Sequence, residues 1–495
     1  MSGADLPSSM QGQAAVATEP PEGRLARIAA HFTAWAERWI PDAFVFALIA
    51  TVIVVVASFF KFAAEKDVAF AAKEVVTVWG AGFWDLIPFT LQMALVIITG
   101  SVVATTRPVY RLIVKLASWP STPRGAVAFV ALMAMTSSWF NWGFSLIFSA
   151  MLAREVARRV PQVDYRAVCA SAFLGLGSVW AQGLSGSAAL QMATPSALQD
   201  SIRRIVAGPG ELVTGGVIPL TGTIFLWQSL LSVAIDLVVV TTLRYFAAPT
   251  GSRAKTAAML GVEFAPSPLD APEPTGRGTP GEWLEFKPWL SLFFVALAGS
   301  YLVMTFATSK DPLNALNLNT LNLGFLTLGV ALHGTPARLM RAVKEATPGI
   351  WGVILQFPLY AGLAALIVKS HLNEVIAGFF VSLSSQQTYP ALVAVYSIVL
   401  GVFVPSGGGK WVIEAPYVMQ AAHDLKVHLG WMVAVYDLGE ALANLVQPFW
   451  MLPVLSLFGL KARDVMGYTF LVFLVLTPLV LVLVTVLAMT LPYPL

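Results

Sequence analysis

The chain is dominated by apolar runs long enough to cross a lipid bilayer. An α-helix of about 20 residues spans a hydrocarbon core of roughly 30 Å. Only 12% of the 495 residues are charged and 57% are hydrophobic, and the runs lack the apolar and polar alternation of barrel strands. The sequence therefore predicts an all-α polytopic membrane protein with about nine full crossings, and it excludes a soluble globular enzyme. We expect the crossings at residues 40–60, 83–104, 165–198, 217–246, 288–307, 319–334, 348–369, 430–458 and 465–490.

Charge and cysteine content narrow the classes of partner and cofactor. The formal net charge is +3, so a nucleic-acid partner is not expected. Cys169 is the single cysteine and cannot form an internal disulfide. No Cys/His group has the spacing of zinc ligands, so we expect no metal site and no cofactor apart from a coupling ion.

Basic residues in the loops set the expected orientation, because such residues concentrate on the cytoplasmic side. Residues 1–38 are polar, lack the pattern of a cleaved signal, and are expected to form a cytoplasmic tail. The last run, 465–490, then carries the chain outward to a periplasmic C-terminus. The basic residues that place these loops are Arg107, Arg111, Lys115, Arg124, Arg338, Arg341, Lys344, Lys461 and Arg463.

The apolar stretch 125–153 has basic residues at both ends, with Arg124 before it and Arg154 directly after it. A straight crossing would leave one cluster outside, whereas a re-entrant hairpin keeps both in the cytoplasm. The polar run Ser-Ser-Trp-Phe-Asn-Trp-Gly at 137–143 supplies the turn. The alternative is one long tilted helix with an ordinary polar spot.

The second half repeats this order upside down. The stretch 389–421 is expected to begin and end outside, and Val404-Pro-Ser-Gly-Gly-Gly-Lys-Trp411 breaks it, because proline and three glycines weaken a helix. The sequence thus predicts an inverted-topology repeat: a first transmembrane half at 39–246, a flexible cytoplasmic linker at 247–286 and a second half at 287–495. Such repeats with broken helices are typical of secondary transporters.

The span after each hairpin is itself interrupted by residues that weaken a helix or carry polar side chains. Backbone groups freed at membrane depth need partners, and an ion or a substrate can supply them. The interrupting residues include Gln182, Ser185, Gly186 and Ser187 in the first half and Asn444 and Gln447 in the second.

Lys410 is the most informative charge. A cation at the tip of a membrane hairpin needs a partner, which is either a substrate carboxylate or a protein acid such as Glu414, four residues on. Asp437 and Glu440 follow at helical spacing and can bind a proton, contribute to a cation site or neutralise Lys410. The glycine run is not a phosphate-binding loop, because Val404 and Trp411 occupy positions that need Gly and Ser or Thr.

Together these segments resemble the bacterial short-chain fatty acid transporters of the AtoE type. The resemblance lies in Val404–Trp411, in Glu414-Ala-Pro-Tyr-Val-Met-Gln420, in Asp437–Pro448 and in the 137–143 run, and it covers nearly the whole chain beyond the tail. It implies a carrier of small monocarboxylates such as butyrate or acetoacetate in the bacterial inner membrane, a homodimer within the ion-transporter superfamily. In that superfamily a domain of two hairpins and two broken helices moves in an elevator-like manner.

The resemblance also implies a set of site residues. Those expected to bind substrate are Ser137, Ser138, Asn141, Ser406, Gly407, Gly408, Gly409 and Lys410. Those expected at the broken helices or in ion coupling are Gln182, Ser185, Gly186, Ser187, Glu414, Asp437, Glu440, Asn444 and Gln447. The two tips lack the Ser-Asn-Thr pattern of the dicarboxylate branch, which puts a doubly charged substrate in doubt.

Two further function classes fit the sequence less well. A cation/proton antiporter using Asp437 and Glu440 has little need for a glycine-rich tip that bears a lysine. A membrane-embedded enzyme needs a nucleophile with a base or a metal constellation, and no such motif is present. The coupling ion, Na⁺ or H⁺, stays open at the level of the sequence.

Overall fold

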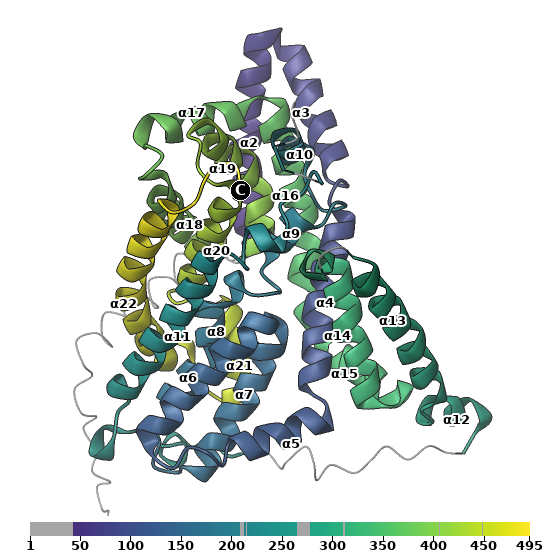
Figure 1. Ribbon diagram of the computed structural model, residues 1–495, viewed down its shortest axis with the longest axis vertical. Coiled ribbons are helices and arrows are strands. Elements are labelled where there is room, and N and C mark those ends of the chain that lie inside the picture. The colour runs from purple at the N-terminus through teal and green to yellow at the C-terminus, as the bar shows by residue number, and fades with distance from the viewer. Residues whose placement is uncertain are drawn as a thin grey trace, which may run out of the picture.

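The structure, a computed structural model, describes residues 43–207, 212–213, 215–264, 278–309, 312–404, 406–447 and 449–495. Within these ranges every regular element is a helix (Figure 1). Among the described residues, six helices are long and apolar enough to cross a membrane, or seven if the one bent pair forms a span, compared with about nine expected crossings. The predicted all-α polytopic membrane fold is confirmed. The six are α2 (Ala43–Glu65), α4 (Ile87–Ala104), α11 (Trp227–Ala247), α13 (Trp289–Thr308), α16 (Trp351–Lys369) and α22 (Ala462–Ala488).

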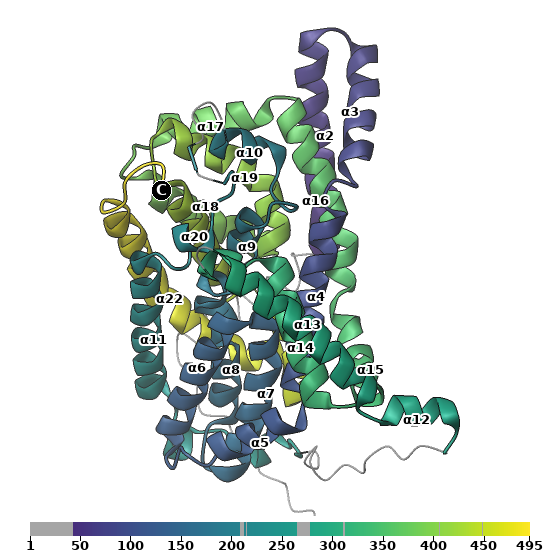
Figure 2. The same cartoon turned by 45° about the vertical axis from the view of Figure 1, so that its right-hand side comes forward.

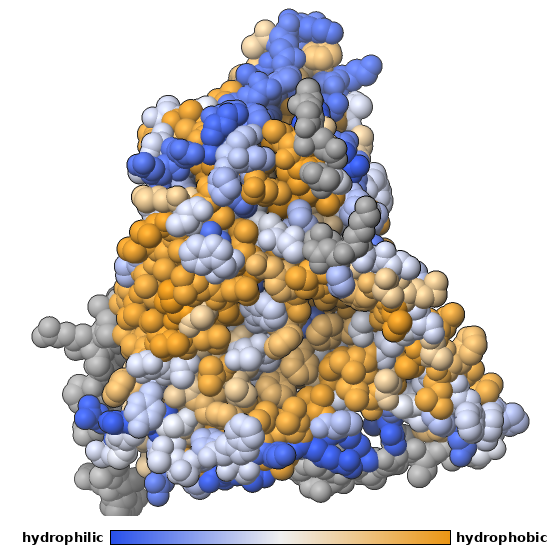
Figure 3. Space-filling view, viewed as in Figure 1, coloured by the Kyte–Doolittle hydropathy of each residue, from blue (hydrophilic) through white to orange (hydrophobic). Residues whose placement is uncertain are grey.

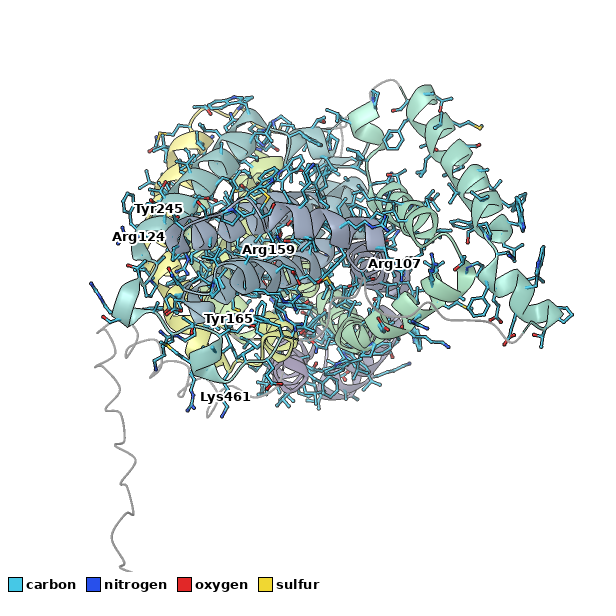
Figure 4. All side chains as sticks on the ribbon, turned by 90° about the horizontal axis from the view of Figure 1, so that it is seen from below. Arg107, Arg124, Arg159, Tyr165, Tyr245 and Lys461 are labelled. Atoms are coloured by element: carbon cyan, nitrogen blue, oxygen red, sulfur yellow. The ribbon has the colours of Figure 1, made fainter. Side chains whose placement is uncertain are left out.

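The stretch 125–153 forms a helical hairpin, which excludes the single tilted helix. Helix α6 (Pro123–Phe140) packs against α7 (Trp142–Arg159), and Asn141 separates them. Asn141 has an extended backbone, with φ of −159°, and its side chain accepts a hydrogen bond from the Phe144 amide at 2.8 Å, which caps α7. Arg124 and Arg159 consequently lie at the same end of the molecule (Figure 4).

The second hairpin enters from the opposite end. It consists of α18 (Tyr389–Phe403) and α19 (Gly407–Asp424), which lie in the upper half of Figure 1, whereas α6 and α7 lie in the lower half. The broken spans follow each hairpin as expected. Helix α8 (Tyr165–Ser178) leads through η1 (Trp180–Gln182) to α9 (Ser187–Ala193) with a bend of 44°. Helix α20 (Leu429–Ala443) is followed by η7 (Phe449–Met451) and α21 (Leu452–Phe458).

The helices form two groups that lie side by side (Figures 1 and 2). The hairpin group contains α6 to α9, α11 and α18 to α22. The flanking group contains α2, α4, α13 and α16 with the shorter α3 (Val68–Gly82), α14 (Leu318–His333) and α15 (Pro336–Ala346). The groups touch where α4 packs on α7 and α16 packs on α19.

Several helices were not predicted as elements of their own because they are short or amphipathic. They are α3, α5 (Arg107–Leu116), α10 (Asp200–Val206), α12 (Pro280–Phe286), α15 and α17 (Leu372–Leu383).

The distribution of hydrophobic and hydrophilic residues on the surface is typical of a membrane protein. Hydrophobic residues gather across the middle of the face in Figure 3, and hydrophilic residues lie above and below them. Arg107, Arg124, Arg159 and Lys461 lie at the lower end, which we call the basic end (Figure 4).

The first part of the predicted linker contacts the start of α8. The Tyr165 amide donates to the carbonyl of Lys255 at 2.9 Å, and the Lys255 amide donates to the Asp164 carboxylate at 3.0 Å. The described first part of the linker, residues 247–264, is therefore bound to the start of α8 at the basic end. Residues 265–277 of the linker, the tail 1–38, Pro405 and Pro448 lie outside the described residues.

We expect Gly100→Ala to destabilise the contact between the two groups. A Cβ at Gly100 would lie 2.6 Å from the Phe144 amide nitrogen and against the Asn141 side chain, so the hairpin tip must shift. Such overpacking costs about 1–3 kcal/mol, which thermal unfolding in detergent measures. Gly299→Ala in α13 is the matched control, because nothing lies within 4 Å of the added Cβ. Equal melting temperatures for the two variants would contradict this packing.

Candidate functional site

The two hairpin tips and the two helix breaks meet at one pocket between the helix groups. Its cavity volume is about 30 Å³. The hairpin group supplies Trp142 from the first tip, Leu176, Trp180 and Ser187 from the first broken span, Ser406, Gly407 and Gly408 from the second tip, and Asn444 and Trp450 from the second broken span. The flanking group supplies Met93 and Ile97 from α4 and Val353 and Phe357 from α16.

Ser406, Gly407 and Gly408, at the start of α19, line this pocket. The first amides of a helix have no acceptor within the helix, and the N-cap residue Ser406 makes no capping hydrogen bond with its side chain. The glycines permit close packing here. A Cβ at Gly407 would meet Trp180 at 2.7 Å, one at Gly408 would meet Ser187 at 3.1 Å, and one at Gly409 would meet Tyr360 at 2.5 Å.

Ser187 brings a buried polar group to the pocket, and Gln182 lies in the break before α9. The Ser187 hydroxyl lines the pocket, is almost fully buried, and has no hydrogen-bond partner among the described residues. The Gln182 amide in the break before α9 is likewise buried, and neither its oxygen nor its nitrogen has a partner within the described chain. Since unpaired buried polar groups are costly, a polar ligand at this point would satisfy them.

Lys410 does not line the pocket. Its side chain is fully buried, and its Nζ lies 2.7 Å from Glu440 Oε2. Nζ also donates to the Ser397 carbonyl at 2.8 Å and to the Ser397 hydroxyl at 2.9 Å. Glu414 Oε1 lies farther away, at 3.9 Å. The partners next to Lys410 are therefore protein acids, and Glu440 is the nearer of the two.

Asp437 lies one helical turn before Glu440 and is fully buried. Its carboxylate interacts electrostatically with the backbone amides of Ala188 and Ala189, in the first turn of α9. Neither of its oxygens makes a hydrogen bond of standard geometry with a described residue.

The predicted residues of the first tip serve mostly to build the hairpin. The Ser137 hydroxyl donates to the Met133 carbonyl at 2.7 Å and to Ser145 at 3.0 Å. Ser138 is fully buried, and Asn141 caps α7. None of the three lines the pocket, so the structure does not bring them together with the second tip, where Ser406, Gly407 and Gly408 face the empty space.

The remaining predicted residues hold the breaks in place. The Ser185 hydroxyl accepts a hydrogen bond from the Trp142 amide at 2.9 Å, which ties the first tip to the broken span. Gly186 is the N-cap of α9. Gln447 donates to Asn444 at 2.6 Å, and Asn444 donates to the Leu176 carbonyl at 3.1 Å, which joins the two breaks.

The apolar wall from the flanking group escaped prediction. Met93, Ile97, Val353 and Phe357 belong to runs that look like ordinary membrane spans, so their sequence carries no signal of a pocket. Trp142 and Trp180, which come from the hairpin group, lie in the predicted tip and the predicted break and were therefore detectable. Within the described ranges, no group of three or more His, Cys, Asp or Glu side chains could hold a metal ion.

Comparison with solved structures shows the fold. The YdaH transporter of Alcanivorax borkumensis superimposes with a TM-score of 0.59 at 16% identity, over 90% of this chain and 98% of that chain. The MtrF protein of Neisseria gonorrhoeae, described within a class of antimetabolite efflux pumps, superimposes with a TM-score of 0.55 at 13% identity, over 94% of this chain and 97% of that chain. At these identities the two structures show that the chain has a multi-pass helical membrane fold.

Comparison of the sequence shows the family. Residues 24–488 match the family model described as short chain fatty acid transporter. A protein of Escherichia coli that is provisionally named a short-chain fatty acid transporter is 35% identical to this chain, over 90% of this chain and 96% of its own length. A protein of Haemophilus influenzae with the same provisional name is 32% identical, over the same shares of the two chains. The chain belongs to the short-chain fatty acid transporter family.

We expect Lys410→Met to destabilise the fold, because it leaves Glu440 buried without its cation. Removing one partner of a buried ion pair costs about 3–5 kcal/mol. The double variant Lys410→Met/Glu440→Gln removes both charges and is expected to recover part of that loss. Thermal unfolding in detergent without substrate measures both effects. A Lys410→Met variant as stable as the wild type would contradict the ion pair.

Proposed function

We propose that this protein is a secondary carrier of short-chain monocarboxylates such as butyrate or acetoacetate, and that the central pocket binds them. The observation that carries the proposal is the composition of the pocket. A helix N-terminus and an unpaired hydroxyl lie at one side, and the rest of the wall is mainly apolar.

The carboxylate fits the first turn of α19. Free amides and the positive end of the helix dipole attract an anion, and the Ser187 hydroxyl can donate one more hydrogen bond. None of the described residues that line the pocket is charged. A monoanion therefore suits it, whereas the second charge of a dicarboxylate would have no compensating group.

The remaining wall suits the hydrocarbon tail, and the cavity of about 30 Å³ must widen to admit it. Trp142, Trp180, Phe357, Val353 and Ile97 offer apolar surface, and burial contributes about 0.8 kcal/mol for each methylene. We infer that this wall gives butyrate its affinity.

The mechanism we propose is elevator-like alternating access. The pocket has walls from both helix groups, so sliding of the hairpin group along α4 and α16 would carry a bound substrate away from the flanking group. We place the basic end in the cytoplasm of a bacterial inner membrane, because Arg107, Arg124, Arg159 and Lys461 gather there (Figure 4). The N-terminus would then be cytoplasmic and the C-terminus periplasmic, and the homodimer stays a prediction.

Uptake of labelled butyrate and acetoacetate into proteoliposomes tests the function. Protein-free liposomes measure the passive flux of undissociated acid, which must be subtracted. Protein-dependent uptake and its saturation are the expected results. Absence of both, together with Na⁺-dependent proton efflux, would favour the cation/proton antiporter.

We expect Ser187→Ala to raise the KM for butyrate, because the carboxylate loses one hydrogen-bond donor. Hydrogen bonds to charged groups contribute about 1.5–3 kcal/mol, which corresponds to roughly tenfold or more in KM. Ser232→Ala is the matched control. Ser232 is also buried, but its hydroxyl donates to the Gln228 carbonyl of its own helix at 3.0 Å, outside the pocket. An unchanged KM in Ser187→Ala would argue against this site.

A further inference from the structure

Four ionisable side chains pack together beside the pocket without reaching solvent. Lys410, Glu414 and Asp437 are fully buried, and Glu440 is 1% exposed. Three acids thus share one cation. A buried carboxylate without a counter-charge is costly at membrane depth, so the cluster is stable only if it also holds additional positive charge.

The geometry indicates which acid lacks a counter-charge. Lys410 Nζ lies 2.7 Å from Glu440 Oε2 and 3.9 Å from Glu414 Oε1, so both glutamates have a cation beside them. Asp437 forms no ion pair with any described residue. Its interactions are with the amides of Ala188 and Ala189, and with the charges of Lys410 and Glu440.

The ionisable residues on the elements packed around α20 include no basic residue that forms an ion pair with Asp437. Helix α9 and η1 contain no ionisable residue, and α20 itself adds only Tyr436 and Glu440. The ionisable residues of the other packed elements are Lys410, Glu414, Tyr417, His423 and Asp424 on α19, Tyr389 and Tyr396 on α18, Tyr165, Arg166 and Cys169 on α8, and Arg463, Asp464 and Tyr468 on α22. The charged residues of α8 and α22 lie in their first turns, at the basic end.

Asp437 is also close to the pocket. It faces the amides that directly follow Ser187, and the Ser187 hydroxyl lines the pocket. An ionised Asp437 and a bound carboxylate would therefore compete for the same positive potential of the broken span. A proton on Asp437 removes this repulsion, so anion and proton bind more tightly together than either does alone.

We propose that Asp437 carries the coupling proton and that the protein is an electroneutral symporter of one proton with one monocarboxylate. The inference rests on the proposed function. The proton binds the Asp437 carboxylate on one side of the membrane and leaves it on the other, together with the substrate anion. The transported pair has no net charge, so a membrane potential does no work on it.

Three measurements in proteoliposomes test the inference. Butyrate counterflow without a gradient reports binding and movement of substrate. Uptake under an inward proton gradient, corrected with protein-free liposomes, reports coupling, and a potential imposed with K⁺ and valinomycin reports net charge. For the wild type we expect counterflow, uptake that follows the proton gradient, and no response to the potential.

Asp437→Asn replaces the acid with a neutral group of the same shape, like its protonated form. It should retain counterflow, lose proton-driven uptake by about tenfold or more, and bind butyrate without dependence on pH. Asp236→Asn is the matched control. Asp236 is equally buried, and its oxygens also lack partners among the described residues, but its helix α11 packs mainly on α6 and α22 and supplies no pocket residue. This variant should behave as the wild type.

Different results separate the two proposals. Absence of butyrate counterflow in the wild type would overturn the proposed function itself. Counterflow with uptake driven only by Na⁺, or with a response to the potential, would overturn proton symport even if a variant failed to fold. Proton-driven uptake that survives in Asp437→Asn, or is lost in Asp236→Asn, would overturn the assignment to Asp437.

Discussion

The need to satisfy backbone polar groups within the membrane governs this structure. Helices that stop at membrane depth leave amides and carbonyls without partners, and lipid cannot supply them. The protein places all four interruptions together, so that they satisfy one another. The Trp142 amide is bound by Ser185, and the Leu176 carbonyl is bound by Asn444. The Ser187 hydroxyl, which stays unpaired among the described residues, lies in the pocket, where a ligand can reach it.

The single cation of the site follows the same logic. Lys410 is too deeply buried to remain alone, and it binds Glu440 and the Ser397 carbonyl instead of facing the pocket. Its charge is thereby used within the hairpin group. Attraction of an anion is left to backbone amides, which carry no full charge and need no counter-ion. This separation leaves Asp437 between the Lys410–Glu440 pair and the amides of Ala188 and Ala189 that follow Ser187.

Much of the fold was predictable because membrane insertion imposes strong rules on sequence. Arg124 and Arg154 flank an apolar stretch, and this pattern indicated a hairpin that the structure confirms. The breaks near Ser187 and Asn444 were evident because polar residues are rare at membrane depth. The short α3 and the amphipathic α5 were not recognised, since neither gives the signal of a full crossing. The docking of the linker through Lys255 was equally hidden, because it depends on a backbone hydrogen bond and on the Asp164 carboxylate, which lies far from Lys255 in the sequence.

The sequence by itself determined the all-helical membrane fold, the two opposed hairpins and the positions of the breaks, because hydrophobicity, loop charge and helix-breaking residues act locally along the chain. Only the tertiary structure decided which of the candidate residues meet. Asn141 and Ser137 stabilise their own hairpin, Lys410 pairs with Glu440, and Phe357 of a distant span completes the pocket wall. These outcomes depend on how two helix groups pack against each other, and that packing is set by side-chain shape across large distances in sequence.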